Sequence, residues 1–217
     1  MKTKQLFHFF ILLGGLFLLT GCDLEIQKPY DFQPEVFPLA TFEDQTVWEW
    51  LQTQQSPNGL AAVDQYKFDF LIEAIQLTGM QEEFNRKGDK RTFLLLNNNA
   101  FDDANEILQT LTGSTKGSLK AANAARLRNV LMYHIVEEYV LQIPTLEVIN
   151  QEYMFQTMIP GEDGLIVMKR NDRYSISVNN TSSLSTTARA ANVRSHNFRF
   201  NNGIGHILND YVRNRPF

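Results

Sequence analysis

Few side chains in this sequence are of the kinds that carry out chemistry. The chain has one cysteine, Cys22, and three of its four histidines, His134, His196 and His206, follow that cysteine. A single cysteine cannot form an intramolecular disulfide or a multi-cysteine metal site. The three histidines are not spaced with carboxylates as a zinc site requires. The sequence therefore predicts no metal and no cofactor, and its single thiol becomes the residue of most interest.

The sequence also lacks the motifs of common enzymes. It contains no Gly-x-Ser-x-Gly elbow and no phosphate-binding loop of the Walker type. Adjacent carboxylates such as Glu82-Glu83 and Glu137-Glu138 diverge on a helix or a strand, so they do not form a catalytic pair. Two carboxylates of a glycosidase can still converge from distant positions, and this alternative stays open. We expect a protein that is not an enzyme.

Cys22 ends a segment that is typical of an export signal. Lys2 and Lys4 precede an apolar stretch over residues 6–19, and Thr20 and Gly21 are small. As a helix this stretch spans roughly 21 Å, which is less than the ~30 Å of a bilayer core. Charge, apolar stretch and small residues in this order are the layout of a secretory signal. Within it, Leu19-Thr20-Gly21-Cys22 resembles the bacterial lipobox.

The lipobox resemblance implies a lipid-anchored protein. Residues 1–21 would be a signal peptide that is removed, and Cys22 would carry acyl chains such as palmitate on its thiol and on its new amino group. Two or more acyl chains anchor a protein stably to a bilayer. We expect a lipoprotein of the Gram-negative cell envelope, in the outer membrane, although Asp23 and Glu25 do not decide which face. An ordinary signal peptide with a chance cysteine is the alternative.

The composition is that of a globular protein with one sizeable core. Hydrophobic residues make up 43% of the chain and charged residues 20%, with a formal net charge of −4. An acidic balance argues against a nucleic-acid binder, which usually carries a basic surplus. Residues 22–40 contain Pro29, Pro34 and Pro38 without any period, so after the lipidated cysteine they are expected to form a tether.

Apolar spacing predicts where the helices and strands lie. A first helix is expected to begin at a cap formed by Thr41 and Asp44 and to carry Val47, Trp48 and Leu51 on one face. Further helices are expected over 68–75, which Gly79 stops, and over 80–84, 101–111 and 127–134. Strands are expected over 92–96, 152–159, 165–170, 173–178 and 192–200. The spacing of Ile204, Ile207, Leu208 and Tyr211 predicts a last short helix before a polar tail, 214–217. Helices first and antiparallel hairpins later predict a single α+β domain.

Three segments, in this order, resemble the boxes of a fasciclin-like domain. They are 91–101, RTFLLLNNNAF; 127–136, LRNVLMYHIV; and 202–212, NGIGHILNDYV. The chain departs from the family at Leu96 and Asn97, where a proline and often an alanine are usual. The resemblance implies a fasciclin-like domain over 41–213, an antiparallel β-sandwich or wedge with helices packed at one side. It also implies a binding or cell-adhesion module that recognises a protein or a glycan.

The fasciclin resemblance also indicates where a binding role would lie. In animal fasciclin-like domains the Tyr-His box has been linked to adhesion, and here it corresponds to Tyr133 and His134. The alternative for His134 is a buried, hydrogen-bonded core histidine. Asn97, Asn98 and Asn99 are expected to cap a helix beginning near residue 100. We expect Gly203 at a strand-to-helix turn, and His206 paired with Asp210 on a helix surface.

A local basic stretch offers a second candidate surface. It consists of Arg189, Arg194, His196 and Arg199, and alternation places Arg194 and His196 on one face of a predicted strand. This face is either a solvated sheet surface or a docking patch for an acidic glycan or a protein. A different partner is implied by a resemblance to Bacteroidetes-type lipoproteins. In that alternative the protein is an accessory subunit of an outer-membrane TonB-dependent nutrient-uptake complex.

Overall fold

A computed structural model describes residues 41–61, 64–102 and 104–217, so the expected signal, Cys22 and the tether lie outside the described residues. Its main helices are α2 (Val47–Gln52), α3 (Asp69–Thr78), α4 (Gln81–Asn85), α5 (Ile107–Thr112) and α6 (Ala124–Tyr133). Its strands are β1 (Thr41–Phe42), β2 (Arg91–Leu96), β3 (Ile135–Val136), β4 (Tyr153–Gln156), β5 (Leu165–Arg170), β6 (Ile176–Val178), β7 (Ala191–Phe200) and β8 (Gly203–Leu208). None of the helices in these ranges has the length and apolarity to cross a bilayer.

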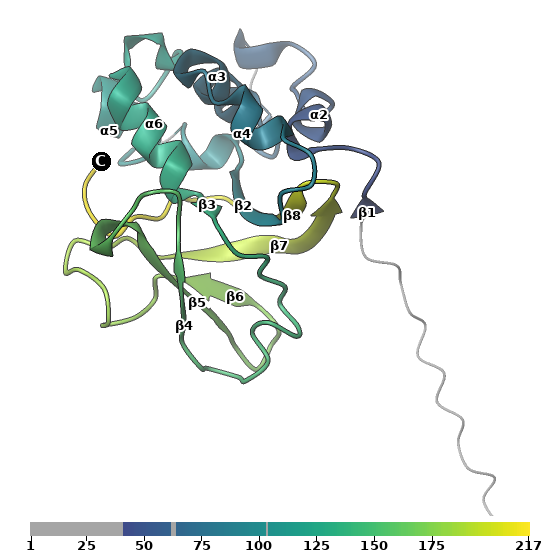
Figure 1. Ribbon diagram of the computed structural model, residues 1–217. Helices are drawn as coiled ribbons and strands as arrows, with labels where there is room; N and C mark the ends of the chain where they lie inside the picture. Colours follow the sequence, from purple (N-terminus) through teal and green to yellow (C-terminus); the bar gives the residue numbers. More distant parts are fainter. Residues whose placement is uncertain (1–40, 62–63, 103) are drawn as a thin grey trace, which may run out of the picture. The chain divides into compact units, whose positions relative to one another are not determined.

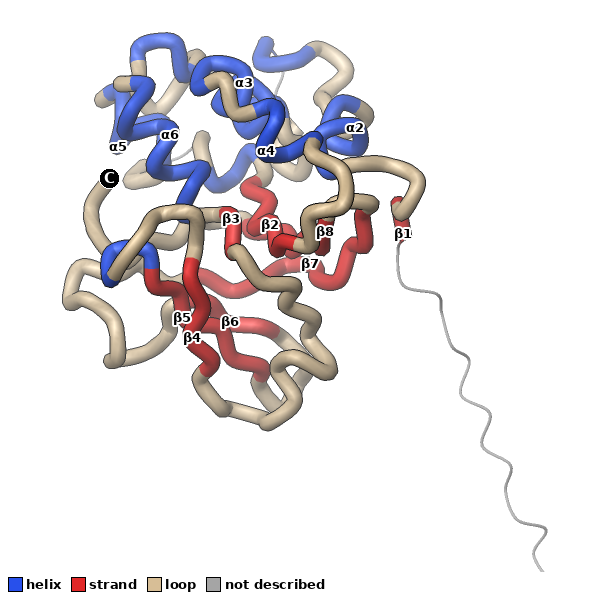
Figure 2. Tube along the Cα trace, viewed as in Figure 1, coloured by secondary structure: helices blue, strands red, loops and turns tan. Residues whose placement is uncertain are grey.

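The strands form one sheet in the order β3-β2-β8-β7-β6-β5-β4, with β1 beside β7. β1 pairs with β7, and β2 with β8, in parallel, while the other pairs along this order are antiparallel. A bridge between Val136 and Thr157 connects the two ends of the order, so the sheet nearly closes. Figures 1 and 2 show the helices gathered on one side of the strands. The predicted α+β class, a wedge of strands with helices at one side, is confirmed.

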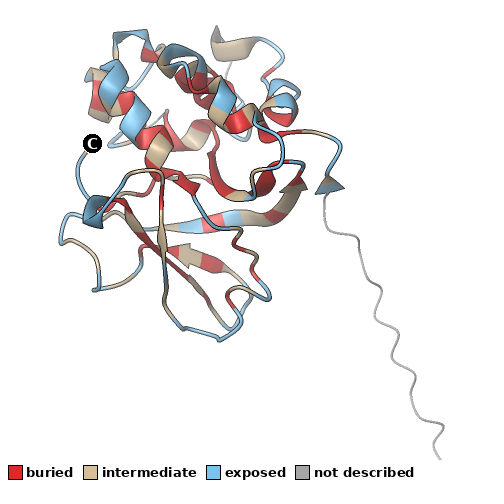
Figure 3. Ribbon diagram, viewed as in Figure 1, coloured by how far each residue is buried: buried red, intermediate tan, exposed pale blue. Residues whose placement is uncertain are grey.

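The core lies where the helices meet the sheet (Figure 3). An aromatic group at one end of it joins α2 to β1 and β7. The Trp50 ring centroid lies 5.3 Å from that of Phe68, 5.4 Å from Phe200 and 5.7 Å from Phe42. Such pairs contribute about 0.5–1.5 kcal/mol each beyond the buried area. This packing holds α2 against the end of β7 that leads into the β7–β8 hairpin.

The first helix begins later than the sequence pattern predicts. Its N-cap is Thr46, whose Oγ1 accepts the Glu49 N–H at 3.2 Å, while the Glu49 carboxylate accepts the Thr46 N–H at 2.7 Å. This reciprocal capping box satisfies two backbone donors at once. Thr41 lies in β1 instead, so the predicted cap was wrong, although Val47 is buried as expected.

The next elements follow their predictions closely, with one exception. α3 ends at Gly79 in the left-handed conformation (φ 66°), which glycine adopts without strain. α4 forms the extra turn expected over 80–84, and β2 is the predicted buried strand. The exception is the helix expected over 101–111, because α5 begins only at Ile107 and the described residues among 101–106 form turns and bends.

The asparagines after β2 do not cap a following helix. They lead into a 3-10 turn, η2 (Asn98–Ala100), and Asn97 makes no side-chain cap bond to it. Asn98 is fully buried and reaches back to α3, where its Oδ1 accepts the Phe70 N–H at 3.1 Å and its Nδ2 donates to the Asp69 carboxylate at 2.7 Å. A buried amide must bond inside the core, so a tertiary partner replaces the predicted local cap.

The segment that was predicted to be the last helix is a strand, β8. It lies between β2 and β7, and Ile204, His206 and Leu208 are fully buried. A strand covered on both faces carries a nearly continuous apolar run, and here that run also fits helical spacing. Gly203 (φ 156°) opens β8 in a hairpin rather than in a strand-to-helix turn. A Cβ on Gly203 would lie 2.3 Å from the Arg91 carbonyl oxygen, so glycine is required there.

The four residues that were expected to form a polar tail pack on the domain. The Phe217 ring centroid lies 6.2 Å from that of Tyr133 and 6.0 Å from that of Tyr211. Asn214 is buried, and its Oδ1 accepts the Ser185 N–H at 2.9 Å. These residues therefore belong to the folded domain.

Candidate functional site

The Tyr-His pair closes α6, and both side chains lie in the core. Tyr133 is the last residue of the helix and His134 is its C-cap, with 1% and 3% of their surface exposed. The Tyr133 hydroxyl donates to the Leu165 carbonyl oxygen at 2.8 Å and accepts from the Asn179 Nδ2 at 2.9 Å. Burial raises the pKa of Tyr133, so this hydroxyl stays neutral.

His134 is held between two backbone groups. Its Nδ1 donates to the Val130 carbonyl oxygen at 2.7 Å, and its Nε2 accepts the Val212 N–H at 3.1 Å. Only the neutral ring with its proton on Nδ1 satisfies both partners. Burial lowers the pKa of His134 to about 4, which favours the same form. Both side chains are nearly fully buried and their polar atoms bond within the domain, so His134 is a core histidine in this structure.

His206 lies at the centre of the sheet rather than on a helix surface. Its Nε2 donates to the Val140 carbonyl oxygen at 2.8 Å, and its Nδ1 accepts the Asn197 N–H at 3.2 Å. Burial lowers its pKa to about 4. The predicted pair of His206 with Asp210 is therefore wrong. Asp210 lies instead 2.5 Å from the Arg189 guanidinium, measured from Oδ1 to Nη2.

The three basic candidate residues on β7 lie in different surroundings. Two bulges interrupt its pairing with β8, and a bulge re-aims the side chains that follow it. Arg194 is exposed, and its guanidinium carbon lies 4.2 Å from the centroid of the Tyr66 ring. His196 is half-buried with its Nε2 3.2 Å from the Gln142 Nε2, and burial lowers its pKa. Arg199, farther along β7, faces an open groove.

We name this hollow the Arg199 groove. Its volume is about 530 Å³, within the range of about 300–1,000 Å³ that ligand clefts usually have. Four segments that are distant in the sequence meet in it: the turn after β1, the connection before β2, the segment after β3, and the β7–β8 hairpin. The polar and half-buried residues that line it include Glu43, Lys90, Tyr139, Leu141, Arg199 and Asn201.

Its charged residues have no ion pairs within the described part of the chain. None of the ion pairs among the described residues involves Lys90, Arg199 or Glu43. The Arg199 Nε is buried and has no hydrogen-bond partner among the described residues. Burial raises the pKa of Tyr139, while Arg199 lowers it and Glu43 raises it. Both charges therefore lie within electrostatic reach of the Tyr139 hydroxyl.

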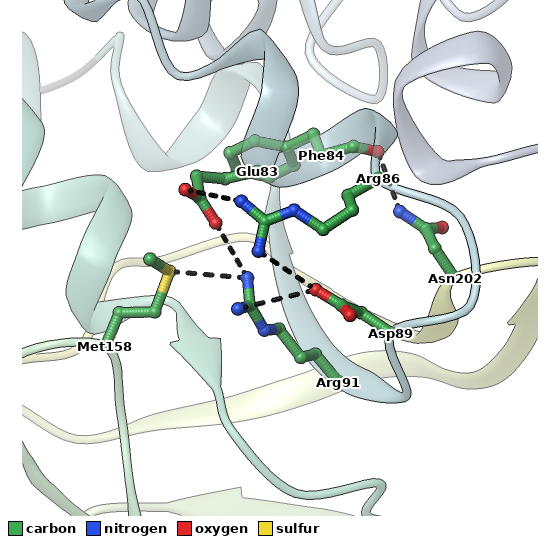
Figure 4. A network of polar contacts seen from close by, with 7 residues as sticks. All are labelled: Glu83, Phe84, Arg86, Asp89, Arg91, Met158 and Asn202. Carbon is green, nitrogen blue, oxygen red and sulfur yellow. Dashed lines mark hydrogen bonds and ion pairs between the residues drawn. The ribbon is translucent and has the colours of Figure 1, made fainter.

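The hairpin that forms one wall of the groove is fixed by Asn202. This side chain is fully buried, and its Oδ1 accepts the Val47 N–H at 3.0 Å. Its Nδ2 donates to the Phe84 carbonyl oxygen at 2.9 Å, as Figure 4 shows. One side chain thus ties the hairpin turn to α2 and α4, and it holds its neighbour Asn201 at the groove.

An ion-pair network, drawn in Figure 4, flanks Lys90, which is another lining residue of the groove. The Arg91 guanidinium lies 2.8 Å from Glu83 and 3.5 Å from Asp89, and Arg86 lies 3.3 Å from each of these carboxylates. These side chains are partly exposed, so each pair contributes only about 0–1 kcal/mol. These ion pairs mainly fix the position of the α4–β2 connection, which carries Lys90.

A second charged cluster lies next to the C-terminal end of β8. The Arg189 Nη2 is 2.5 Å from both the Glu106 Oε1 and the Asp210 Oδ1, and its guanidinium carbon is 4.0 Å from the Tyr211 ring centroid. Burial first, and then the charge of Asp210, raise the pKa of Glu106 to about 7, although Arg189 lowers it. Throughout the described residues, no group of three or more His, Cys, Asp or Glu is placed to hold a metal ion.

Glu106→Gln is expected to stabilise the protein at pH 8 and to leave it nearly unchanged at pH 5. Because the pKa of Glu106 in the fold, about 7, lies above its ordinary value of 4.5, the folded state is favoured by protonation. This contribution is complete below pH 4.5 and is lost as the pH rises through 7. Glutamine imitates the protonated group, so the free energy of unfolding at pH 8 should rise by about 1–2 kcal/mol in urea titrations. A variant less stable than the natural protein at pH 8 would contradict this.

Comparison with known proteins agrees with this architecture. The family model described as the fasciclin domain matches residues 66–212. Among solved structures, the FAS1 domain pair of the insect cell adhesion molecule fasciclin I is similar, with a TM-score of 0.53 and 10% sequence identity. That match covers 78% of this chain and 51% of the insect chain, so this protein spans about half the length of the pair, and at this identity the likeness shows the fold alone. No curated protein matches the chain. Since the family match covers well over half of the sequence, the chain belongs to the fasciclin domain family.

Proposed function

We propose that this protein is a lipid-anchored binding and adhesion module of the bacterial cell envelope that recognises a protein or a glycan. The observation that carries the binding role is the fasciclin match over residues 66–212, because fasciclin domains are adhesion-type modules and not enzymes. The Arg199 groove supports the proposal, since it is an open hollow of ligand size with charged side chains that are not paired within the described residues.

The anchoring part of the proposal depends on Cys22, which follows Leu19, Thr20 and Gly21. Cys22→Ser removes the thiol that would accept the lipid. We expect this variant to leave the membrane fraction or to remain unprocessed, whereas Thr20→Ser, which keeps a small residue there, should behave as the natural chain. Partitioning of Cys22→Ser into detergent to the same extent as the natural protein would contradict lipidation. Outer-membrane location is tested on the same samples by density-gradient fractionation.

The binding role is tested with the full-length protein against a panel of glycans and peptides. We expect at least one of them to be retained and recovered chemically unchanged. Hydrolysis of panel members at useful rates would contradict a non-enzymatic role, and it would point to carboxylates converging from distant positions.

A further inference from the structure

We infer that the Arg199 groove is the ligand site of this module and that it takes a uronic-acid residue of an acidic glycan, whose carboxylate binds Arg199 and Lys90. This inference rests on the proposed binding function and adds the ligand class and the residues. It is supported by the hydrogen-bond and ion-pair partners that the groove residues have within the described residues, and by those that they lack.

The guanidinium of Arg199 lacks the partners that neighbouring arginines have. Its Nε is buried without a hydrogen-bond partner in the described part of the chain, whereas nearby Arg86 and Arg91 are paired with carboxylates. A buried donor that lacks a partner costs about 1–3 kcal/mol, and more when it is charged. The Arg199 guanidinium also has no ion pair within the described residues, so its Nη groups remain to bind a carboxylate in the groove, which guanidinium groups do through two parallel hydrogen bonds.

The charged side chains that line the groove give it a net positive charge. Lys90 is exposed on the wall formed by the α4–β2 connection and adds a second positive charge to that of Arg199. Glu43 is the acidic residue among the lining residues, so the groove carries a net positive charge on a protein whose formal net charge is −4. A positive hollow on an acidic protein concentrates anions locally.

The uncharged and acidic lining residues favour a sugar acid over other anions. Glu43 accepts hydrogen bonds and Asn201 both donates and accepts them, which suits the hydroxyl groups of a sugar. The half-buried Tyr139 and Leu141 offer apolar surface to the face of a pyranose ring. Glu43 would repel the dense charge of a polyphosphate or nucleic acid. A polyhydroxylated ring with one carboxylate satisfies all of these groups together.

Bonds within the domain fix the walls of the groove without a ligand. Asn202 fixes the hairpin that carries Asn201, and the network of Glu83, Asp89 and Arg91 fixes the connection that carries Lys90 (Figure 4). A site whose walls are already in place loses less conformational entropy on binding.

The test uses the full-length protein in mild detergent and isothermal titration with oligogalacturonate, oligomannuronate and hyaluronan fragments. We expect binding to at least one of them and none to its methyl ester, which keeps the sugar but lacks the charge. Arg199→Gln should weaken binding about tenfold to a hundredfold, since it removes a charge-assisted bond. Lys90→Gln should weaken it less. Arg128→Gln, which removes the same charge from the exposed side of α6, should bind normally.

Several results would overturn the inference. Affinity of a folded Arg199→Gln variant equal to that of the natural chain would exclude the groove, and equal affinity for dextran sulfate would show a general polyanion effect. If Arg199→Gln does not fold, Arg199→Lys keeps the charge without the two-pronged geometry and should bind with intermediate affinity. Binding of a neutral glycan or a protein, unaffected by Arg199→Gln, would overturn this inference while keeping the proposed function. Binding to nothing in either panel would overturn both.

Discussion

His206→Leu is expected to lower the free energy of unfolding by about 4 kcal/mol, the largest loss we expect from one substitution. Leucine keeps an apolar side chain in the sheet but leaves the Val140 carbonyl oxygen and the Asn197 N–H without their partner. Each buried group left unbonded costs about 1–3 kcal/mol. Equilibrium urea titration at pH 7.5 gives the difference directly.

His196→Leu is the matched control for this substitution. His196 lies on the neighbouring strand and is half-buried, and within the described residues its ring makes one side-chain hydrogen bond, with Gln142. Its replacement should therefore cost less than about 1 kcal/mol. Equal losses for the two variants, or a His206→Leu variant as stable as the natural protein, would show that the two bonds of His206 do not stabilise the sheet.

Acidification from pH 7 to pH 4 is expected to remove about 6 kcal/mol of stability through His134 and His206 together. Burial holds the pKa of each ring at about 4 in the folded protein, against an ordinary value of 6.5. The unfolded chain therefore binds more protons between these values, so their contribution to stability is complete above pH 6.5 and is lost as the pH falls towards 4. Each shift corresponds to about 3 kcal/mol. Urea titrations at one-unit pH intervals measure this slope.

Two variants separate the histidines from the opposing carboxyl. His206→Leu should lose roughly half of the slope between pH 6.5 and 4, since one of the two rings no longer titrates. Glu106 acts in the opposite direction, because its pKa is raised to about 7, so Glu106→Gln should steepen the loss of stability towards acid. An unchanged slope in His206→Leu would contradict the assignment.

The parts of the fold that follow from local pattern were predictable. α3 has an amphipathic period and a glycine stop at Gly79, and β5 and β6 are joined by a polar turn at Asn171 and Asp172. β8 was not predictable by period, because burial on both faces removes the alternation that distinguishes a strand from a helix. The role of Asn98 as a link to α3 depends on a segment 28 residues away, which no local pattern shows.

In the candidate site, too, some residues were predictable from local pattern and others were not. The Tyr-His box could be recognised from sequence, but whether its side chains point inward was an open alternative, which the bonds of Tyr133 and His134 decide. Arg199 was a candidate because it lies in a basic stretch. Lys90 and Tyr139 were missed, since they come from segments without a motif and meet Arg199 only through the pairing of β3, β2, β8 and β7 in the sheet.

The most direct test of the account is to purify the tagged full-length protein from its native membranes in mild detergent and to analyse what accompanies it. Mass spectrometry would identify proteins, and uronic-acid analysis would quantify acidic glycan. We expect a lipidated protein that retains uronic acid, with much less retained by Arg199→Gln. A stoichiometric β-barrel transporter, with no uronic acid, would contradict it and would identify the protein as a subunit of an uptake complex.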